Sequence, residues 1–308
     1  MKSSKIVVVG SANTDMIIQL ERIPRPGETI LGGEFSMAAG GKGANQAVAA
    51  ARAGGAVDFI ACVGEDMFGQ QAVAGFEKDG INMAHIIRHP TSPSGVALIF
   101  VDQKGENSIA VASGANGQLL PEHINGAAEA IASAGILVMQ LEIPMVTVHK
   151  AAALAADNNV KVILNPAPAQ MLSDELLANI SILTPNETEA ELLTGIAVNN
   201  ESDAAAAAKV LLGKGVEFVI ITLGEKGAFV ATSDSCEIIS GFTVETVDST
   251  AAGDTFNGAL AVALGENKSL KAAVRFANAA AALSVTKLGA QPSAPRREEI
   301  DGLFGQEV

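Results

Sequence analysis

The sequence predicts an α/β fold with a mainly parallel central sheet. Three observations indicate it: short runs rich in Val and Ile recur along the chain, helical patterns lie between them, and aromatic residues make up only 4% of the composition while alanine is abundant. Short apolar runs of this kind form strands that are buried on both faces. Strands that alternate with helices imply βαβ units with right-handed crossovers.

The strands are expected where the apolar runs lie, beginning with KIVVVG at residues 5–10. Similar runs follow at residues 58–64, 136–141, 160–165, 180–184 and 218–223. Between them, apolar residues recur with the spacing of one helix face. This spacing predicts helices over residues 44–53, 122–134, 146–158, 187–194 and 204–213, and two more that begin at Asp254 and at Leu270, the latter ending near Ser284.

Two regions break this alternation, at about residues 14–40 and 94–116. Both contain β-rich stretches, and the turn signals Pro26-Gly27 and Lys104-Gly105 interrupt them. We expect a small antiparallel β-sheet inserted in a single α/β domain that spans residues 1–308. Such a sheet could close over a ligand as a lid or supply a surface for a partner. The alternative is an edge extension of the main sheet.

Charge and targeting signals exclude several classes of protein. The formal net charge of −14 argues against binding of nucleic acid or of an anionic membrane. The chain shows no uninterrupted apolar run of transmembrane length and no signal peptide at its start, so we expect a cytoplasmic protein. Its two cysteines, Cys62 and Cys236, lack the spacing of a redox motif, and we expect free thiols with no role beyond packing.

The stretch VDSTAAGDTFNGAL, residues 247–260, places an aspartate at the start of a predicted helix. Apolar residues follow Asp254 with helical spacing, so Asp254 lies in or next to the first turn. The small residues Ala251, Ala252 and Gly253 precede it and leave backbone N–H groups accessible. Asp254 could be an N-terminal helix acid that satisfies these donors. Alternatively, the donors hold an anion while Asp254 takes a proton beside it.

A glycine cluster opens the first long helix, in AAGGKGANQAVAAARAG at residues 38–54. It lacks the spacing of a Walker A loop. Gly40, Gly41 and Gly43 instead allow the backbone to approach a ligand closely, and Lys42 and Asn45 would face the same point. A tight strand-to-helix turn is the alternative.

Polar side chains follow the predicted strands, where open α/β sheets place their ligands. Asn13 and Asp15 lie in GSANTD at residues 10–15, and Glu142 ends ILVMQLE. Such groups suit the hydroxyls of a polyol. Because GxGxxG is missing after the first strand, a nicotinamide or flavin enzyme is disfavoured.

Two further strand-to-helix junctions carry candidate ligands. TPNETE, which begins at residue 184, contains Asn186 and Glu189, three residues apart. This pair could form a helix capping box or orient hydrated Mg²⁺. TLGEKG, residues 222–227, is a glycine-containing turn suited to close approach of the backbone.

Taken in this order, GSANTD, the glycine cluster, TPNETE, TLGEKG and DSTAAGDTFNGAL resemble the ribokinase family of sugar and nucleoside kinases. The resemblance extends to GAQPSAPRREEID at residues 289–301. It implies a Rossmann-type three-layer domain with a β lid, and ATP-dependent phosphorylation of the 5-hydroxyl of D-ribose to give D-ribose 5-phosphate and ADP. The alternatives are a family member that acts on deoxyribose, fructose or a nucleoside, and a non-catalytic sugar-binding regulatory protein.

The resemblance implies roles for individual residues. Asp254 matches the catalytic base, and the backbone of Ala251, Ala252 and Gly253 matches the anion hole. The positions that match sugar contacts are Asn13, Asp15, Gly41, Lys42, Asn45 and Glu142, with Asp254. The positions that match contacts to ATP are Asn186, Thr222, Gly224, Gly227, Gly253 and Asn278.

The resemblance also implies metal ions and a partner subunit. Asn186 and Glu189 match the element associated with Mg²⁺. The positions that match a site for a monovalent cation, usually K⁺, are Asp248, Thr250, Ser284, Lys287, Gly289 and Ser293, with Lys287 contributing its carbonyl. The lid resembles the one through which bacterial members of the family form homodimers.

Overall fold

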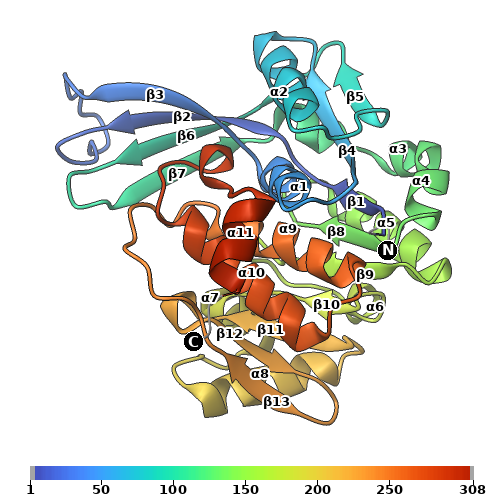
Figure 1. Ribbon diagram of the computed structural model, residues 1–308. Coiled ribbons are helices and arrows are strands. Elements are labelled where there is room, and N and C mark those ends of the chain that lie inside the picture. Colours follow the sequence, from blue (N-terminus) through green and yellow to red (C-terminus); the bar gives the residue numbers. More distant parts are fainter. Residues whose placement is uncertain (1–3, 306–308) are drawn as a thin grey trace.

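The computed structural model describes residues 4–305, which form a nine-stranded sheet and a separate four-stranded sheet (Figure 1). The strand order of the large sheet is β13-β12-β11-β10-β9-β8-β1-β4-β5. Its parallel strands are β1 (Ile6–Val9), β4 (Val57–Gly64), β5 (Ile86–His89), β8 (Ile136–Met139), β9 (Lys161–Leu164), β10 (Ile182–Leu183) and β11 (Phe218–Thr222). At one edge, β12 (Ala228–Ala231) and β13 (Cys236–Ile239) continue the sheet as an antiparallel ribbon.

Helices cover both faces of the large sheet, which gives three layers. Along β1, Ile6 and Val8 belong to one hydrophobic core, while Val7 and Val9 belong to the other, as the alternation of a strand requires. The first core is closed by α1 (Lys42–Arg52), α2 (Met67–Lys78), α9 (Ala252–Gly265), α10 (Leu270–Ser284) and α11 (Arg297–Phe304). The second is closed by α3 (Pro121–Gly126), α4 (Ala128–Ala132), α5 (Met145–Asp157), α6 (Asp174–Leu177), α7 (Glu187–Thr194) and α8 (Glu201–Leu212).

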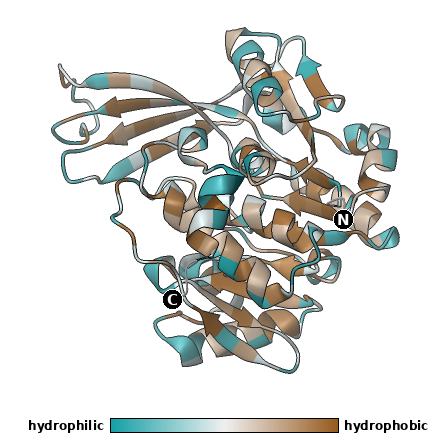
Figure 2. Ribbon diagram, in the orientation of Figure 1, coloured by the Kyte–Doolittle hydropathy of each residue, from teal (hydrophilic) through white to brown (hydrophobic). Residues whose placement is uncertain are grey.

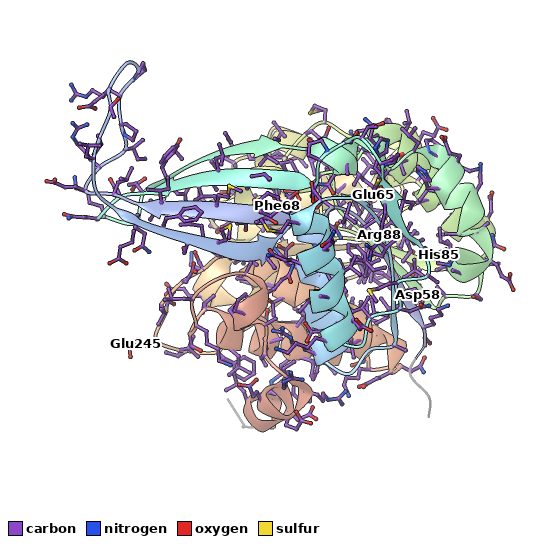
Figure 3. All side chains as sticks on the ribbon, turned by 90° about the horizontal axis from the view of Figure 1, so that it is seen from above. Asp58, Glu65, Phe68, His85, Arg88 and Glu245 are labelled. Atoms are coloured by element: carbon purple, nitrogen blue, oxygen red, sulfur yellow. The ribbon has the colours of Figure 1, made fainter. Side chains whose placement is uncertain are left out.

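The separate four-stranded sheet, which we call the lid, has the strand order β3-β2-β6-β7. Its central strands run parallel to each other, and each outer strand is antiparallel to its neighbour. The sheet projects away from the helical layers as an arm (Figures 1 and 3), so the alternative of an edge extension is wrong. The strands are β2 (Asn13–Gln19), β3 (Glu34–Gly40), β6 (Gly95–Val101) and β7 (Asn107–Ala112).

Several elements differ from the sequence predictions. The helix predicted over residues 122–134 is divided into α3 and α4, because Ala127 has φ of −104° and ψ of 12° and leaves the helical path after Gly126. Helix α1 begins at Lys42 and not at residue 44. The sequence analysis did not predict α2, β5, α6, the ribbon β12–β13 or α11.

The topology fixes where a ligand site can form. Strand β1 pairs with β4 on one side and with β8 on the other. The chain first moves outward through β4 and β5 and then returns to β8. The strand order therefore reverses between β1 and β8, and open α/β sheets bind ligands at the carboxyl ends of the strands at such a point.

Candidate active site

The glycine cluster joins lid strand β3 to helix α1 by close backbone packing. Gly41 has φ of 88°, and a Cβ at this position would lie 2.6 Å from the Asn13 nitrogen. A Cβ at Gly43 would lie 2.5 Å from the Ser11 nitrogen. Any larger residue would therefore push α1 away from the segment that follows β1.

Glu142 and Ser11 satisfy the first N–H groups of α1, where no side chain of the helix itself serves as a cap. Glu142 Oε2 accepts the Lys42 N–H at 3.0 Å, and Ser11 Oγ accepts the Gly43 N–H at 3.3 Å. Ser11 Oγ also donates to Glu142 Oε2 at 2.5 Å. The segments after β1 and β8 are thereby tied to one helix terminus. Ser11 was missed by the sequence analysis.

Asp254 is the third residue of α9 and is only 6% exposed. Its two oxygens accept from side chains of α1 and not from its own helix: Asn45 Nδ2 lies 2.9 Å from Oδ2, and Gln46 Nε2 lies 2.9 Å from Oδ1. Asp254 is thus an acid of the first turn of α9, as expected, but it does not satisfy the N–H groups of its own helix. Its carboxylate instead faces the beginning of α1.

Four carboxylates act electrostatically on the ammonium of Lys42. Burial lowers the pKa of Lys42, but Asp254, Glu142, Glu189 and Asp15 together raise it above its ordinary value. Burial raises the pKa of Asp254, and Lys42 and the amides of α1 oppose this shift without cancelling it. The pKa of Asp15 is raised to about 6, mainly by burial and then by Glu142 and Asp254. The site thus combines several acids (the acid cluster) with one partly buried cation that influence each other's pKa.

The turn before α9 is strained. Ala251 has φ of 58°, a left-handed conformation that costs a non-glycine residue about 1–2 kcal/mol. The Ala252 N–H donates to the Ser249 carbonyl at 3.3 Å. Gly253 is exposed, and as a first-turn residue its N–H has no helical carbonyl to reach. Of the predicted anion-hole positions, Gly253 therefore offers a donor, while the Ala252 N–H is engaged.

A cavity of about 420 Å³ is lined by two of the predicted sugar positions, Asn13 and Glu142. The other predicted sugar positions are not part of its lining: Asp15, Gly41, Lys42, Asn45 and Asp254. Asn116 holds Asn13, because its Nδ2 donates to Asn13 Oδ1 at 2.7 Å. The Asn13 amide nitrogen is therefore left to act as a donor. Asn45 Oδ1 is buried and has no hydrogen-bond partner among the described residues.

A second cavity, of about 500 Å³, lies between the beginning of α9 and the turn after β11. Three of the predicted ATP positions line it: Gly224, Gly227 and Asn278. Asn278 Nδ2 donates to the carbonyls of Ile239 and Ser240, at 2.9 and 3.1 Å, which fixes one wall. The other predicted ATP positions, Asn186, Thr222 and Gly253, are not part of its lining.

Asn186 and Glu189 form a capping box at the start of α7. Asn186 Oδ1 accepts the Glu189 N–H, and Glu189 Oε2 accepts the Asn186 N–H, each at 2.8 Å. Asn186 also forms a bridge to Thr222, which brings the turn after β10 against the end of β11. Burial raises the pKa of Glu189, while the Asn186 N–H and Lys42 lower it in part.

Asp248 joins the two loops that carry the predicted cation positions. Its carboxylate accepts the Thr250 N–H at 2.9 Å and the Gly289 N–H at 2.8 Å, and these bonds hold its pKa below the usual range against the effect of burial. Ser284 and Ser293 are fully buried. The Lys287 ammonium lies 2.7 Å from Glu299 Oε1, so this side chain is engaged with α11.

Some site residues escaped the sequence analysis although a signal was present. Gln140, Asn165 and Thr184 directly follow β8, β9 and β10, at the same edge of the sheet as Ser11. Each is buried, and polar residues at the carboxyl ends of parallel strands mark a ligand site. By this rule the sequence predicts Asn13, Asp15 and Glu142, and Gln140, Asn165 and Thr184 meet the same criterion.

Comparison with known proteins shows the family. A model described as pfkB family carbohydrate kinase matches residues 3–297. Ribokinase from Haemophilus influenzae is 51% identical over 294 residues, which cover 96% of each chain. Deoxyribokinase from Salmonella typhi is 39% identical over 297 residues, covering 96% of this chain and 97% of that one.

The fold agrees with a solved structure of the same family. Arabidopsis thaliana ribokinase complexed with ribose and ATP superposes with a TM-score of 0.94 and 35% identity, covering 99% of this chain and 100% of that one. The predicted fold class, a mainly parallel α/β sheet with a small additional sheet, is confirmed. The chain belongs to the pfkB family of carbohydrate kinases.

Proposed function

We propose that the protein transfers the γ-phosphoryl group of ATP to the 5-hydroxyl of D-ribose, giving D-ribose 5-phosphate and ADP. The observation that carries the proposal is the placement of Asp254, a buried carboxylate held by two amide donors at the beginning of a helix. The ribokinase from Haemophilus influenzae and the Arabidopsis complex with ribose and ATP support the choice of substrates. Both substrates and their products are cytoplasmic metabolites, and we propose that the enzyme works in that compartment.

The pocket that we assign to the sugar offers complementary hydrogen-bonding groups. The Asn13 amide nitrogen donates, and the carboxylates of Asp15 and Glu142 accept. The buried Asn45 Oδ1 accepts from a ligand hydroxyl, since leaving such an oxygen unpaired costs about 1–3 kcal/mol. Lys42 offers donors among these acids, and Gly41 lets the backbone come close.

The chemical step needs positioning and charge stabilisation more than covalent chemistry. Asp254 accepts the proton of the attacking hydroxyl, a role that typically contributes about 10²–10⁴-fold to the rate. The Gly253 N–H and the dipole of α9 stabilise charge on the transferring phosphoryl group. The turn of Ala251 and Ala252 sets the position of that N–H. Asn278 and the glycines Gly224 and Gly227 bound the cavity that we assign to ATP.

The residues present fit a hydrated Mg²⁺ that accompanies ATP. Within residues 4–305 there is no cluster of three or more side chains able to cage a metal ion. Mg²⁺ usually keeps several waters and binds through phosphate oxygens and one or two carboxylates. Glu189, oriented by Asn186 and backed by Thr222, is the carboxylate that we assign to it. Mg²⁺ supplies charge neutralisation of the phosphates.

The residues around Asp248 also fit a monovalent cation. Asp248 brings together the backbone of Thr250 and of the loop that contains Gly289, while Lys287 turns its ammonium away. Backbone carbonyl oxygens are the ligands that select K⁺ in proteins. We assign K⁺ to the backbone of these loops, which include Ser284 and Ser293. A bound cation adds positive potential near the start of α9 in a protein of net charge −14.

We also propose that the lid joins two copies of the chain. Five large apolar side chains of the lid strands are strongly exposed: Phe35 at 61%, Met37 at 49%, Leu98 at 47%, Ile109 at 55% and Val111 at 51%. Figure 2 shows how hydrophobic these strands are, although they lie away from both cores. A contiguous exposed apolar surface marks an interaction site, and the lid strands carry it far from the helical layers.

An ADP-release assay tests the function with D-ribose, 2-deoxyribose, fructose and adenosine, each in K⁺ and in Na⁺. We expect D-ribose to give the highest kcat/KM and its turnover to rise with K⁺. The 39% identity to a deoxyribokinase makes 2-deoxyribose the decisive comparison. A preference for another acceptor would contradict the assignment of ribose as the substrate. Ribose binding without turnover on any acceptor would show that the protein is not a kinase.

Substitution of Asp254 by Asn tests the base. The side chain keeps its shape, and one amide oxygen still accepts a hydrogen bond, but it cannot take a proton. We expect kcat to fall about 10²–10⁴-fold while calorimetry shows ribose binding within a few-fold of wild type. Unchanged kcat would contradict the role of Asp254.

A further inference from the structure

Gln46 is a second residue of α1, next to Asn45, that donates to the proposed base. It is fully buried in α1 and is not part of either cavity lining. Its Nε2 donates to Asp254 Oδ1 at 2.9 Å and to Asn165 Oδ1 at 3.1 Å. Its Oε1 accepts from Gln140 Nε2 at 2.6 Å. The two amide hydrogens and the carbonyl oxygen are thus all engaged.

The direction of this amide is fixed by its neighbours. Rotating it by 180° would place its oxygen against the Asp254 carboxylate and the Asn165 oxygen, which can only accept. Asn165 cannot turn either, because its Nδ2 donates to the Thr184 carbonyl at 3.3 Å. The chain of bonds therefore has one consistent polarity, and it ends with an N–H directed at Asp254.

The same chain of hydrogen bonds also fixes the orientation of the Gln140 amide. Its Oε1 is buried and has no hydrogen-bond partner among the described residues. An unpaired buried oxygen costs about 1–3 kcal/mol, yet reversing Gln140 would remove the donor that holds Gln46. Gly10 makes room for this oxygen, since a Cβ there would lie 2.1 Å from it. The orientation of Gln46 is thus retained against a local cost.

We propose that Gln46 is a positioning residue that fixes the orientation of Asp254 through this chain of hydrogen bonds. A donor that bonds to the ionised form of a carboxyl group favours that form. Asn45 makes a similar bond, but it belongs to the proposed sugar pocket, where a ligand can disturb it. Gln46 holds the base before and after the sugar binds. The proposal rests on the proposed kinase function.

Other charges act on Asp254, and they come from several elements. Lys42, at the beginning of α1, lowers its pKa, and Glu142, after β8, raises it. Asp15 in the lid and Glu189 in α7 interact with it electrostatically. These groups remain when Gln46 is changed. A change in the pKa of Asp254 can therefore be attributed to the loss of the Gln46 amide.

The test compares the pH dependence of kcat for wild type, Gln46→Met and Gln46→Glu. Methionine has a similar size but no donor. We therefore expect the acid limb of the kcat profile, where kcat falls as Asp254 takes a proton, to move to higher pH by about one unit. Glutamate brings a second carboxyl group against Asp254, and such pairs retain a shared proton to higher pH. We therefore expect a larger shift for Gln46→Glu. The KM for ribose stays within about two-fold of wild type for Gln46→Met, since the Gln46 side chain is fully buried.

Thr147→Val is the matched control. It removes a buried hydrogen bond of α5, from Thr147 Oγ1 to the Leu119 carbonyl at 2.6 Å, outside the chain of bonds that includes Asp254 and Gln46. We expect it to lower stability and to leave the acid limb in place. Gln140→Met removes only the anchor of Gln46, and we expect a smaller shift in the same direction. If neither Gln46 variant folds, the shift measured for Gln140→Met tests the proposal.

The outcomes separate this proposal from the function on which it rests. If Asp254→Asn abolishes turnover and the limb moves in the expected order, both proposals stand. If Asp254→Asn abolishes turnover but the Gln46 variants lower kcat equally at every pH, Gln46 is only structural and this inference fails. If Asp254→Asn keeps wild-type kcat, the proposed base is wrong and the inference fails with it.

Discussion

Asp15 joins the lid to the acid cluster and has a pKa raised to about 6 by burial, Glu142 and Asp254. The fold therefore favours its neutral form, and the resulting penalty on the charged form increases as pH rises from about 4 to 6 and is fully present above 6. We expect Asp15→Asn to increase the free energy of unfolding at pH 7, on the order of 2 kcal/mol. The gain should shrink as pH is lowered towards 4. Urea unfolding at pH 7 and pH 4.5 measures it.

The same substitution should weaken ribose binding, because an acceptor for sugar hydroxyls becomes an amide. In wild type, the ribose affinity measured by calorimetry should fall as pH drops below about 6, where Asp15 takes a proton. Asp234→Asn, on the exposed turn between β12 and β13, is the control and should change neither property. A stability gain of equal size at both pH values would argue against the raised pKa.

Individual residues were predictable where the local sequence carries its own signal. Gly41 and Lys42 belong to a glycine-rich helix start, and Asp254 follows a run of small residues. Gln46 looks like any polar residue in an alanine-rich helix, because its partners Gln140 and Asn165 are about 94 and 119 positions away. Such contacts depend on strand order, which local periodicity does not contain. The left-handed backbone conformation of Ala251 could not be predicted from the sequence either, since alanine rarely adopts it.

The capping box of α7 serves the helix, and under our proposal it also serves Mg²⁺. Asn200 caps α8 in a similar way, by accepting the Asp203 N–H at 3.1 Å, but it is exposed. We expect Asn186→Ala and Asn200→Ala each to lower the free energy of unfolding by about 1 kcal/mol. Asn186→Ala alone should raise the Mg²⁺ concentration that gives half-maximal rate, because Glu189 loses its orientation.

The measurements are urea unfolding and initial rates at increasing Mg²⁺. Asn200→Ala is the matched control, since it removes the same kind of cap outside the site. If both variants show the Mg²⁺ dependence of wild type, the pair is only a capping box and its association with the metal ion is wrong.

Helices were predicted correctly where the helical spacing of apolar residues continues without interruption. The helix predicted over residues 187–194 has those bounds as α7, and the helix from Leu270 ends at Ser284 as α10. The prediction of a single helix over residues 122–134 was wrong, because the apolar spacing continues across Ala127, where the backbone departs from a helix. The ribbon β12–β13 was missed because its strands have four residues each, and one of them is largely exposed.

At the scale of the molecule, the lid has two faces with different roles. Cross-strand partners point to the same side of a sheet, and successive residues point to opposite sides. Asp15 pairs with Ala38 and Ala97, so this face belongs to the acid cluster. The next row, Met37, Met16 and Leu98, lies on the opposite face, followed on that face by the row Phe35, Ile18 and Phe100. One face thus serves the pocket, and the other presents six large apolar side chains.

Leu98→Glu tests whether that apolar face joins two subunits. A charge in the middle of a buried apolar interface is left without a partner, which costs several kcal/mol. We expect sedimentation equilibrium at micromolar concentration to give a dimer for wild type and a monomer for the variant. Val210→Glu, on α8, is the control: Val210 is 36% exposed and isolated from the lid, and the variant should remain a dimer. A wild-type monomer, or a Leu98→Glu dimer as stable as wild type, would show that this face does not hold the subunits together.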